Sequence, residues 1–160
     1  MNPTHLPYVS TGYRDSDITG VGGRVVRATA EAALLIGDVV LWSVANKVNK
    51  STTPADYYQF AGVVVGGAPT NNRVVEVTST TSLAYAAAGA GQDVLIQIDG
   101  IAWMVSGAAI TFPNRITVDT GVAGRVIAWV NTFVVGSLCG AAAGGAGEWI
   151  KVHLNPRMTQ

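Results

Sequence analysis

The segment AAGAGQDVLIQI at residues 87–98 is matched in pattern by AAGGAGEWIKVHL at residues 142–154. In both segments a loop of small residues leads into a run in which apolar side chains alternate, the period of a half-buried β-strand. The alternating apolar residues share one phase in the two segments: Val94, Ile96, Ile98, Ile150, Val152 and Leu154. We therefore interpret the chain as a duplicated strand–loop–strand module.

Two segments upstream of these strands support the duplication. Residues 36–41 (IGDVVL) resemble residues 112–117 (FPNRIT), and residues 60–67 (FAGVVVGG) resemble residues 133–140 (FVVGSLCG). The similar halves run from about 30 to 100 and from 101 to 155. A repeated module of this kind describes a scaffold and does not by itself describe an active site.

Composition favours a protein that is buried among partners. The chain has 160 residues, 49% of them apolar and only 12% charged, with a formal net charge of zero. That charged fraction is about half the usual share, and it protects a soluble monomer poorly against association. We expect one domain whose surface is covered in large part by other subunits.

The basic residues are scattered, whereas nucleic-acid binders cluster them, so no direct nucleic-acid contact is expected.

The single cysteine, Cys139, excludes an internal disulfide and is predicted to be a buried hydrophobe. Residues 126–147 form a long uncharged run, but its glycines and its strand-forming residues predict two strands and a loop rather than a membrane span.

Residues 1–23 differ from the rest of the chain. They are rich in Pro, Thr, Ser, Gly, Asp and Tyr and show no hydrophobic period. We interpret them as an extended N-terminal arm, with a disordered tail as the alternative. Tyr8, Tyr13, Arg14 and Arg24 favour an interaction arm, because Tyr and Arg are enriched at interfaces.

Residues 24–160 are predicted to form a single β-barrel domain. Short Val-rich runs separated by turn residues indicate a barrel or sandwich. Asp99-Gly100 and, more weakly, Asn131-Thr132 suggest tight hairpins. The predicted strands are Arg24–Ala28, Val39–Ser43, Phe60–Val65, Arg73–Thr78, Val94–Asp99, Ile101–Val105, Arg115–Val118, Arg125–Val130, Phe133–Ser137 and Trp149–Leu154.

Residues suited to catalysis are few. No His or Cys spacing fits a zinc site, and the glycine-rich loops lack the Lys and Ser/Thr of a phosphate loop. We expect no enzyme, no cofactor and no metal site. All four tryptophans fall in predicted strands; Trp149 is chosen as an interface anchor, and core positions are expected for the other three: Trp42, Trp103 and Trp129.

The order of these segments resembles the small all-β decoration (cement) proteins of tailed-phage capsids. The residues that carry the resemblance in the first half are 33–40 (ALLIGDVV), 60–64 (FAGVV) and 91–102 (GQDVLIQIDGIA). In the second half they are 109–110, 116–119, 134–138 and 147–152, so that the resemblance covers about residues 30–155. Pro113-Asn114 stands where the family has Gly-Asp.

The resemblance implies a tulip-like β-barrel on the outer surface of the mature virion. The expected partners are the major capsid protein and two further copies of the chain, as a homotrimer at three-fold or quasi-three-fold sites. A glycan-binding head-fibre or adhesin module is the alternative. A trimeric nucleotide hydrolase of the dUTPase kind is less favoured, because residues 155–160 (NPRMTQ) lack its C-terminal phosphate motif.

Overall fold

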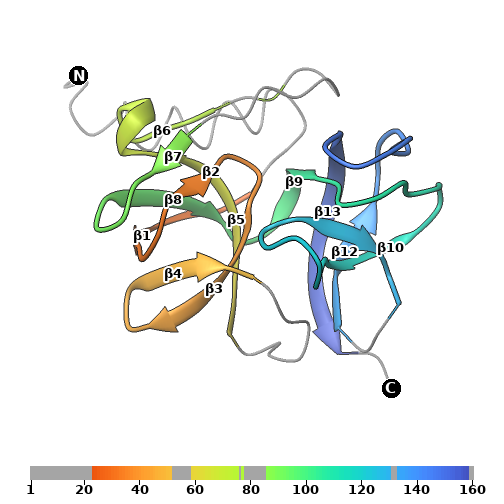
Figure 1. Ribbon diagram of the computed structural model, residues 1–160, viewed down its shortest axis with the longest axis horizontal. Helices are drawn as coiled ribbons and strands as arrows, with labels where there is room; N and C mark the ends of the chain where they lie inside the picture. Colours follow the sequence, from red (N-terminus) through yellow and green to blue (C-terminus); the bar gives the residue numbers. More distant parts are fainter. Residues whose placement is uncertain (1–22, 52–58, 76, 78–85, 131–132, 159–160) are drawn as a thin grey trace.

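The computed structural model describes residues 23–51, 59–75, 77, 86–130 and 133–158 (Figure 1). The predicted all-β fold built from two similar halves is confirmed, and each predicted strand overlaps an observed one. A short 3-10 helix, η2 (Ala68–Thr70), interrupts the strands. The strands are β1 (Val25–Ala30), β2 (Leu34–Leu35), β3 (Val39–Val44), β4 (Lys47–Lys50), β5 (Phe60–Gly67), β6 (Arg73–Val74), β7 (Ala86–Ala88), β8 (Asp93–Gln97), β9 (Gly100–Val105), β10 (Arg115–Val118), β11 (Val126–Ala128), β12 (Phe133–Leu138) and β13 (Trp149–Met158).

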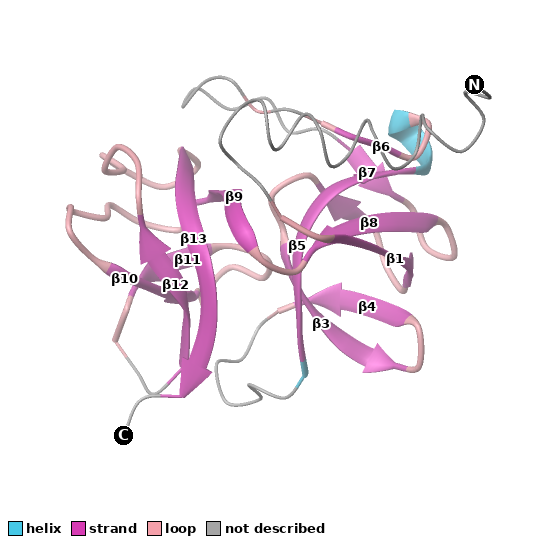
Figure 2. Cartoon of the chain, turned by 180° about the vertical axis from the view of Figure 1, so that it is seen from behind, coloured by secondary structure: helices cyan, strands magenta, loops and turns pink. Residues whose placement is uncertain are grey.

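Each half closes its own ring of strands, whereas the sequence suggested one barrel formed jointly. In the first half the order β3-β4-β1-β8-β5 is closed by pairing of β5 with β3. In the second half the order β11-β10-β12-β13-β9 is closed by a parallel bridge between Ser106, which follows β9, and Val126 of β11. Figures 1 and 2 show these two barrels side by side along the long axis.

The two barrels share one topology and one register. Strands β1, β3, β4, β5 and β8 correspond in order to β9, β10, β11, β12 and β13. Val26 pairs with Ile96 in the first barrel as Ala102 pairs with Val152 in the second. The parallel closing contacts also correspond, since Ala30↔Val48 is matched by Ser106↔Val126.

A glycine at equivalent positions lets each barrel close. Gly62 lies opposite Val40, and Gly136 lies opposite Ile116. A Cβ on Gly62 would collide with the backbone carbonyl oxygen of Gln97, and a Cβ on Gly136 would collide with that of His153. These two carbonyl oxygens occupy the same place in each barrel. The sequence comparison aligned residues 60–67 with residues 133–140, which would pair Gly62 with position 135. The structural match to Gly136 therefore lies one residue later in the second half.

The strongest hairpin signal in the sequence is the linker between the barrels. Asp99-Gly100 joins β8 to β9, but β8 pairs with β1 and β5, and β9 pairs with β13. The prediction of a hairpin at this dipeptide was therefore wrong. The hairpin expected at residues 131–132, which lie outside the described residues, is not formed either, because β11 and β12 both flank β10.

The barrels are joined along a seam to which both contribute buried residues. Val39 and Val63 of the first barrel belong to the core of the second, and Trp149 of the second belongs to the core of the first. The backbone also crosses the seam: Val39 N–H donates to Gly124 O at 2.8 Å, and Gly124 N–H donates to Ser51 O at 3.0 Å. The seam is thus an interface between domain-like units inside one chain.

Candidate protein-binding surface

The large apolar side chains that remain exposed gather on the second barrel. Among the described residues, Val130 is 72% exposed and Phe112 61%, while Leu35 and Val44 are exposed on the first barrel. Phe112 and Val130 adjoin Pro113 and Trp129 in the chain, which line one depression, and exposed apolar surface marks interaction sites. The exposed residues of the second barrel are Phe112, Val122, Trp129, Val130 and Met158.

A shallow depression of about 390 Å³ lies within this surface. Strand β10 alternates, so Ile116 points into the barrel core and Arg115 points outward. The Arg115 guanidinium lies over the Trp129 ring, 5.4 Å from its centroid, a cation–π geometry. The residues that line the depression are Pro113, Asn114, Arg115, Trp129, Ser137 and Leu138.

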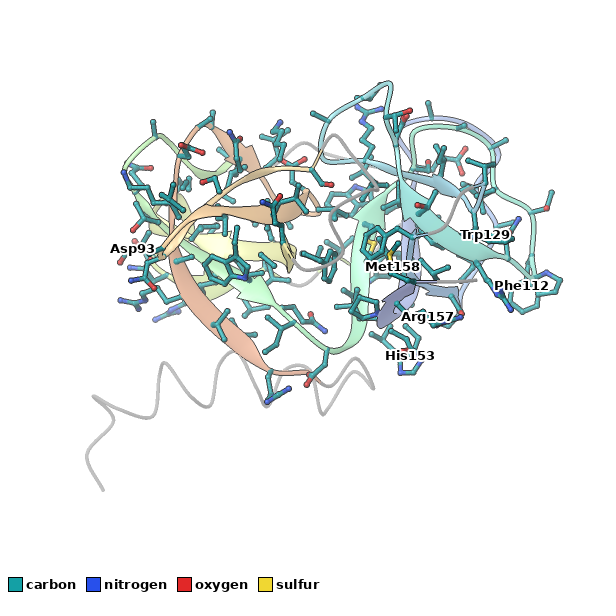
Figure 3. The ribbon with its side chains drawn as sticks, turned by 90° about the horizontal axis from the view of Figure 1, so that it is seen from below. Asp93, Phe112, Trp129, His153, Arg157 and Met158 are labelled. Carbon is teal, nitrogen blue, oxygen red and sulfur yellow. The ribbon has the colours of Figure 1, made fainter. Side chains whose placement is uncertain are left out.

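A second shallow depression, of about 270 Å³, lies on the first barrel at the turn between β3 and β4. It is lined by Trp42, Val44, Ala45 and Asn46. Asn46 adopts a left-handed conformation with φ 63°, which Asn tolerates better than most residues. In Figure 3, Asp93 of the first barrel and Phe112 and Trp129 of the second lie at opposite ends of the molecule.

Asp38 is an unusual acidic residue at the seam. Its carboxylate accepts a hydrogen bond from Leu35 N–H at 2.8 Å and pairs with Lys50 Nζ at 3.3 Å. Burial raises the pKa of Asp38 above its usual value, although the Leu35 bond and Lys50 act in the opposite direction. The residue at the equivalent position of the second barrel is Asn114, which carries no charge.

Arg24 and Asp99 tie the start of the first barrel to the linker. The Asp99 carboxylate accepts hydrogen bonds from the backbone N–H and the Nε of Arg24, both at 2.6 Å. The backbone bond, followed by the side-chain bond and charge of Arg24, lowers the pKa of Asp99. Arg24, predicted as an interface residue, is thus exposed and engaged within its own chain.

The structure corrects the assignment of the tryptophans. Trp149, predicted as an anchor for another subunit, is 2% exposed and packs at the seam. An anchor for another subunit needs accessible surface, which Trp149 lacks. Trp129, expected in the core, is 36% exposed, and Trp42 and Trp103 are partly buried. Tyr8, Tyr13 and Arg14 lie outside the described residues.

Cys139 is exposed, so the prediction of a buried hydrophobe was wrong. It follows the inward-facing Leu138 at the end of β12 and donates its backbone N–H to Lys151 O at 3.0 Å. Although the residue is exposed, partial desolvation of its thiol raises the pKa of Cys139, with Lys151 acting in the opposite direction.

His153 is exposed on β13 between the buried Val152 and Leu154, in the alternation that the sequence indicated. Within the described residues, no three His, Cys, Asp or Glu side chains gather closely enough to hold a metal ion. A search of the same residues finds no helix with the length and apolar character needed to cross a membrane.

Comparison with solved structures gives a distant likeness to a phage protein. No protein family matches the chain, and no curated protein matches it. The fold is similar to that of the N base of head fiber gp8.5 in bacteriophage phi29, a phage capsid-associated protein known from a crystal structure. The TM-score is 0.49 at 11% identity, over 82% of this chain and 93% of that chain. At this distance the likeness carries no argument about function.

Proposed function

We propose that the chain is a structural protein of a tailed-phage virion. In this proposal it binds the outer surface of the mature capsid and bridges neighbouring major capsid proteins, without catalysis. The observation that carries the proposal is the exposed apolar surface of the second barrel, where Val130 is 72%, Phe112 61% and Trp129 36% exposed. Such a surface fits a protein that works in contact with other proteins.

The chemistry of that surface suits protein recognition. Aromatic residues and Arg contribute most of the binding energy at interfaces, and Trp129 and Arg115 stand together in the depression. A charged fraction of 12% leaves few ions to desolvate when copies pack closely. On a capsid lattice many modest contacts add through effective concentration, so a homotrimer at a three-fold or quasi-three-fold site would bind more tightly than one copy.

The test is co-sedimentation of the purified protein with mature, undecorated capsid shells of the phage that encodes it. Saturation at a fixed number of copies per three-fold site is the expected result. Val130→Asp combined with Met158→Asp places two charges on the exposed apolar surface and should weaken binding by about tenfold or more. Leu35→Asp combined with Ala90→Asp, at two exposed residues of the first barrel, is the matched control with the same number of added charges.

The absence of saturable binding at micromolar protein would overturn the proposal. Equal loss of binding in the control and in the double variant would show that the effect is a general one of added charge. Circular dichroism of each variant establishes that the barrels are folded before binding is compared.

Glycan binding is a second candidate, and the exposed Trp129 favours it. Sugars stack on accessible indole rings, and Trp129 lines an open depression. Arg115 lies over that ring, and the 36% of Trp129 that is exposed is the surface on which a sugar would stack. A glycan array with Trp129→Ala as control distinguishes this function, since only carbohydrate binding that disappears in the variant would support it.

A further inference from the structure

The depression around Trp129 has a counterpart in the first barrel that is already occupied. Arg115 pairs with Ser137 as Val39 pairs with Val63. Backbone hydrogen bonds match as well: Leu138 N–H to Asn114 O repeats Val64 N–H to Asp38 O, and Trp129 N–H to Arg115 O repeats Ser51 N–H to Val39 O. The residues that line the depression therefore correspond, in order, to Gly37, Asp38, Val39, Ser51, Val63 and Val64.

In the first barrel these equivalent residues form the seam. Val39 and Val63 are fully buried in the core of the second barrel. Gly37 lies under the Trp149 ring, so closely that a Cβ would collide with it, and a Cβ on Gly124 would meet the Asp38 carboxylate. The surface that is covered in the first barrel is thus the surface that is open in the second.

The covering side of the seam also has an open counterpart. Register pairs Thr29 with Asp93 as it pairs Val105 with Trp149. Asn46 stands two residues before Val48, as Gly124 stands two residues before the equivalent Val126, and both have left-handed φ angles, 63° and 83°. The covering surface formed by Val105, Trp149 and Gly124 therefore corresponds to Thr29, Asp93 and Asn46, and Asn46 lines the depression on the first barrel.

We propose that the Arg115–Trp129 depression of one chain binds the Thr29–Asp93–Asn46 surface of a second copy, repeating head to tail the contact that joins the two barrels. The proposal rests on the multi-copy assembly proposed above and names the contact that makes it. The two surfaces lie at opposite ends of the molecule (Figure 3). A contact between unlike surfaces generates a closed ring or an open filament, not a two-fold dimer.

The residues that differ between the seam and the open surfaces define the character of this contact. The buried Val39 is replaced by the exposed Arg115, and the buried Trp149 by Asp93, which pairs with Arg27 at 3.4 Å. Opposite charges thus stand on the two surfaces that would meet. A contact with more polar groups than the seam is weaker and more specific, as expected between subunits that assemble reversibly.

Cysteine cross-linking tests the pairing directly. In a Cys139→Ser background, Arg115→Cys and Asn46→Cys are prepared separately, because the equivalent residues Val39 and Gly124 are hydrogen-bonded through their backbones. A head-to-tail contact predicts a disulfide when the two variants are mixed and none in either variant alone. Ala146→Cys, in the exposed loop before β13, replaces Arg115→Cys in the matched control.

A disulfide within Arg115→Cys alone would show a two-fold contact and would overturn the proposal. Equal yields with the Ala146→Cys control would show random collision and would do the same. The expected yield is at least about tenfold higher for the matched pair than for the control, since proximity raises effective concentration.

Sedimentation of variants without new cysteines gives an independent test. The average molecular mass of the natural protein should increase with protein concentration, because copies associate. Arg115→Asp should weaken this association by about tenfold. Arg157→Asp, on β13 of the same barrel, is the charge-matched control and should leave the association unchanged. A natural chain that stays monomeric at all concentrations, both alone and on shells treated with a lysine cross-linker, would refute the contact.

The outcomes separate this inference from the proposed function. Saturable capsid binding by chains that never contact each other would refute the inference and leave the virion role intact. Head-to-tail association without any capsid binding would support the inference and refute the virion role.

Discussion

Replacement of Trp149 by alanine is the most direct test of the seam. The side chain is 2% exposed and belongs to the core of the first barrel although β13 is part of the second. Burial of a tryptophan removes roughly 150–250 Å² from water, worth about 4–6 kcal/mol at ~25 cal/mol per Å². That value is an upper bound, because the unfolded chain already buries some surface. Large-to-small core replacements at aromatic positions cost about 3–5 kcal/mol, which is the expected loss.

The assay is equilibrium unfolding in urea followed by circular dichroism, which does not depend on the tryptophan removed. Trp129→Ala is the matched control, since it deletes the same side chain from a position that is 36% exposed. The unfolding free energy lost in Trp129→Ala should stay below about 1.5 kcal/mol, because the side chain is only partly buried and its cation–π contact is exposed to solvent.

A loss at Trp149 below about 1 kcal/mol, or one equal to the loss at Trp129, would refute the reasoning. Either result would mean that the barrels do not depend on the indole between them. The seam would then be a loose contact, and its use as the pattern for a contact between copies would lose its basis.

Three further predictions follow from named contacts. Gly37→Ala should destabilise the protein by more than about 2 kcal/mol, because the new Cβ collides with the Trp149 ring and the residue must also keep a positive φ. Gly147→Ala is the control, with nearly the same φ and nothing within 4 Å, and it should cost only about 1 kcal/mol. Equal losses of unfolding free energy in the two variants would contradict this prediction. The pKa of Asp38 is raised in the folded protein, so the natural chain loses stability as pH rises from the unfolded pKa through the higher folded pKa. The unfolding free energy of Asp38→Asn should therefore increase relative to that of the natural chain as pH rises above about 4. A difference between the two that stays constant from pH 4 to pH 7 would argue against this. Cys139 should react with iodoacetamide in the folded protein, because the residue is exposed. The reaction rate should rise only at a pH above the usual pKa range of cysteine thiols, because the pKa of Cys139 is raised. Protection of the thiol until the protein unfolds would contradict its exposure.

Strand positions could be predicted because apolar alternation is a local signal. The register of β8 and β13, inferred from the phase of Val94 and Ile150, is the register that the two barrels share. Strand β4 was not predicted, because Lys47, Asn49 and Lys50 surround a single buried Val48. A strand identified by one apolar residue is held by its neighbours β3 and β1 rather than by its own pattern.

Strand pairing could not be read from turn chemistry. Gly100 has φ 78°, so the glycine of this dipeptide does adopt the left-handed conformation that a change of chain direction uses. The chain then continues into a different barrel, because the partners of β8 and β9 come from distant parts of the sequence. A local turn signal specifies a change of direction, whereas pairing is decided by which edges remain free.

The burial of the tryptophans depends on a contact that the sequence does not encode locally. Trp149 is the first residue of β13 and Trp129 directly follows β11, and neither side chain belongs to the core of the second barrel. Trp149 is buried because the first barrel covers it, whereas Trp129 stays 36% exposed with the Arg115 guanidinium over its ring. The face that a neighbour covers follows from the arrangement of the two barrels, so no pattern within either strand could distinguish the core residue from the surface residue.

The same comparison explains why the open surface of the second barrel is more than an unfinished copy of the first. A duplicated barrel whose end only had to face water would gain solubility by replacing all the apolar residues there with charged ones. Here Val39 and Val63 are matched by Arg115 and Ser137, while Trp129 stands where the first barrel has the buried Ser51. The end has become more polar at its strands and more aromatic at its rim. That combination is typical of a surface that is exposed in the free chain and covered in an assembly, which is what the proposed contact between copies requires.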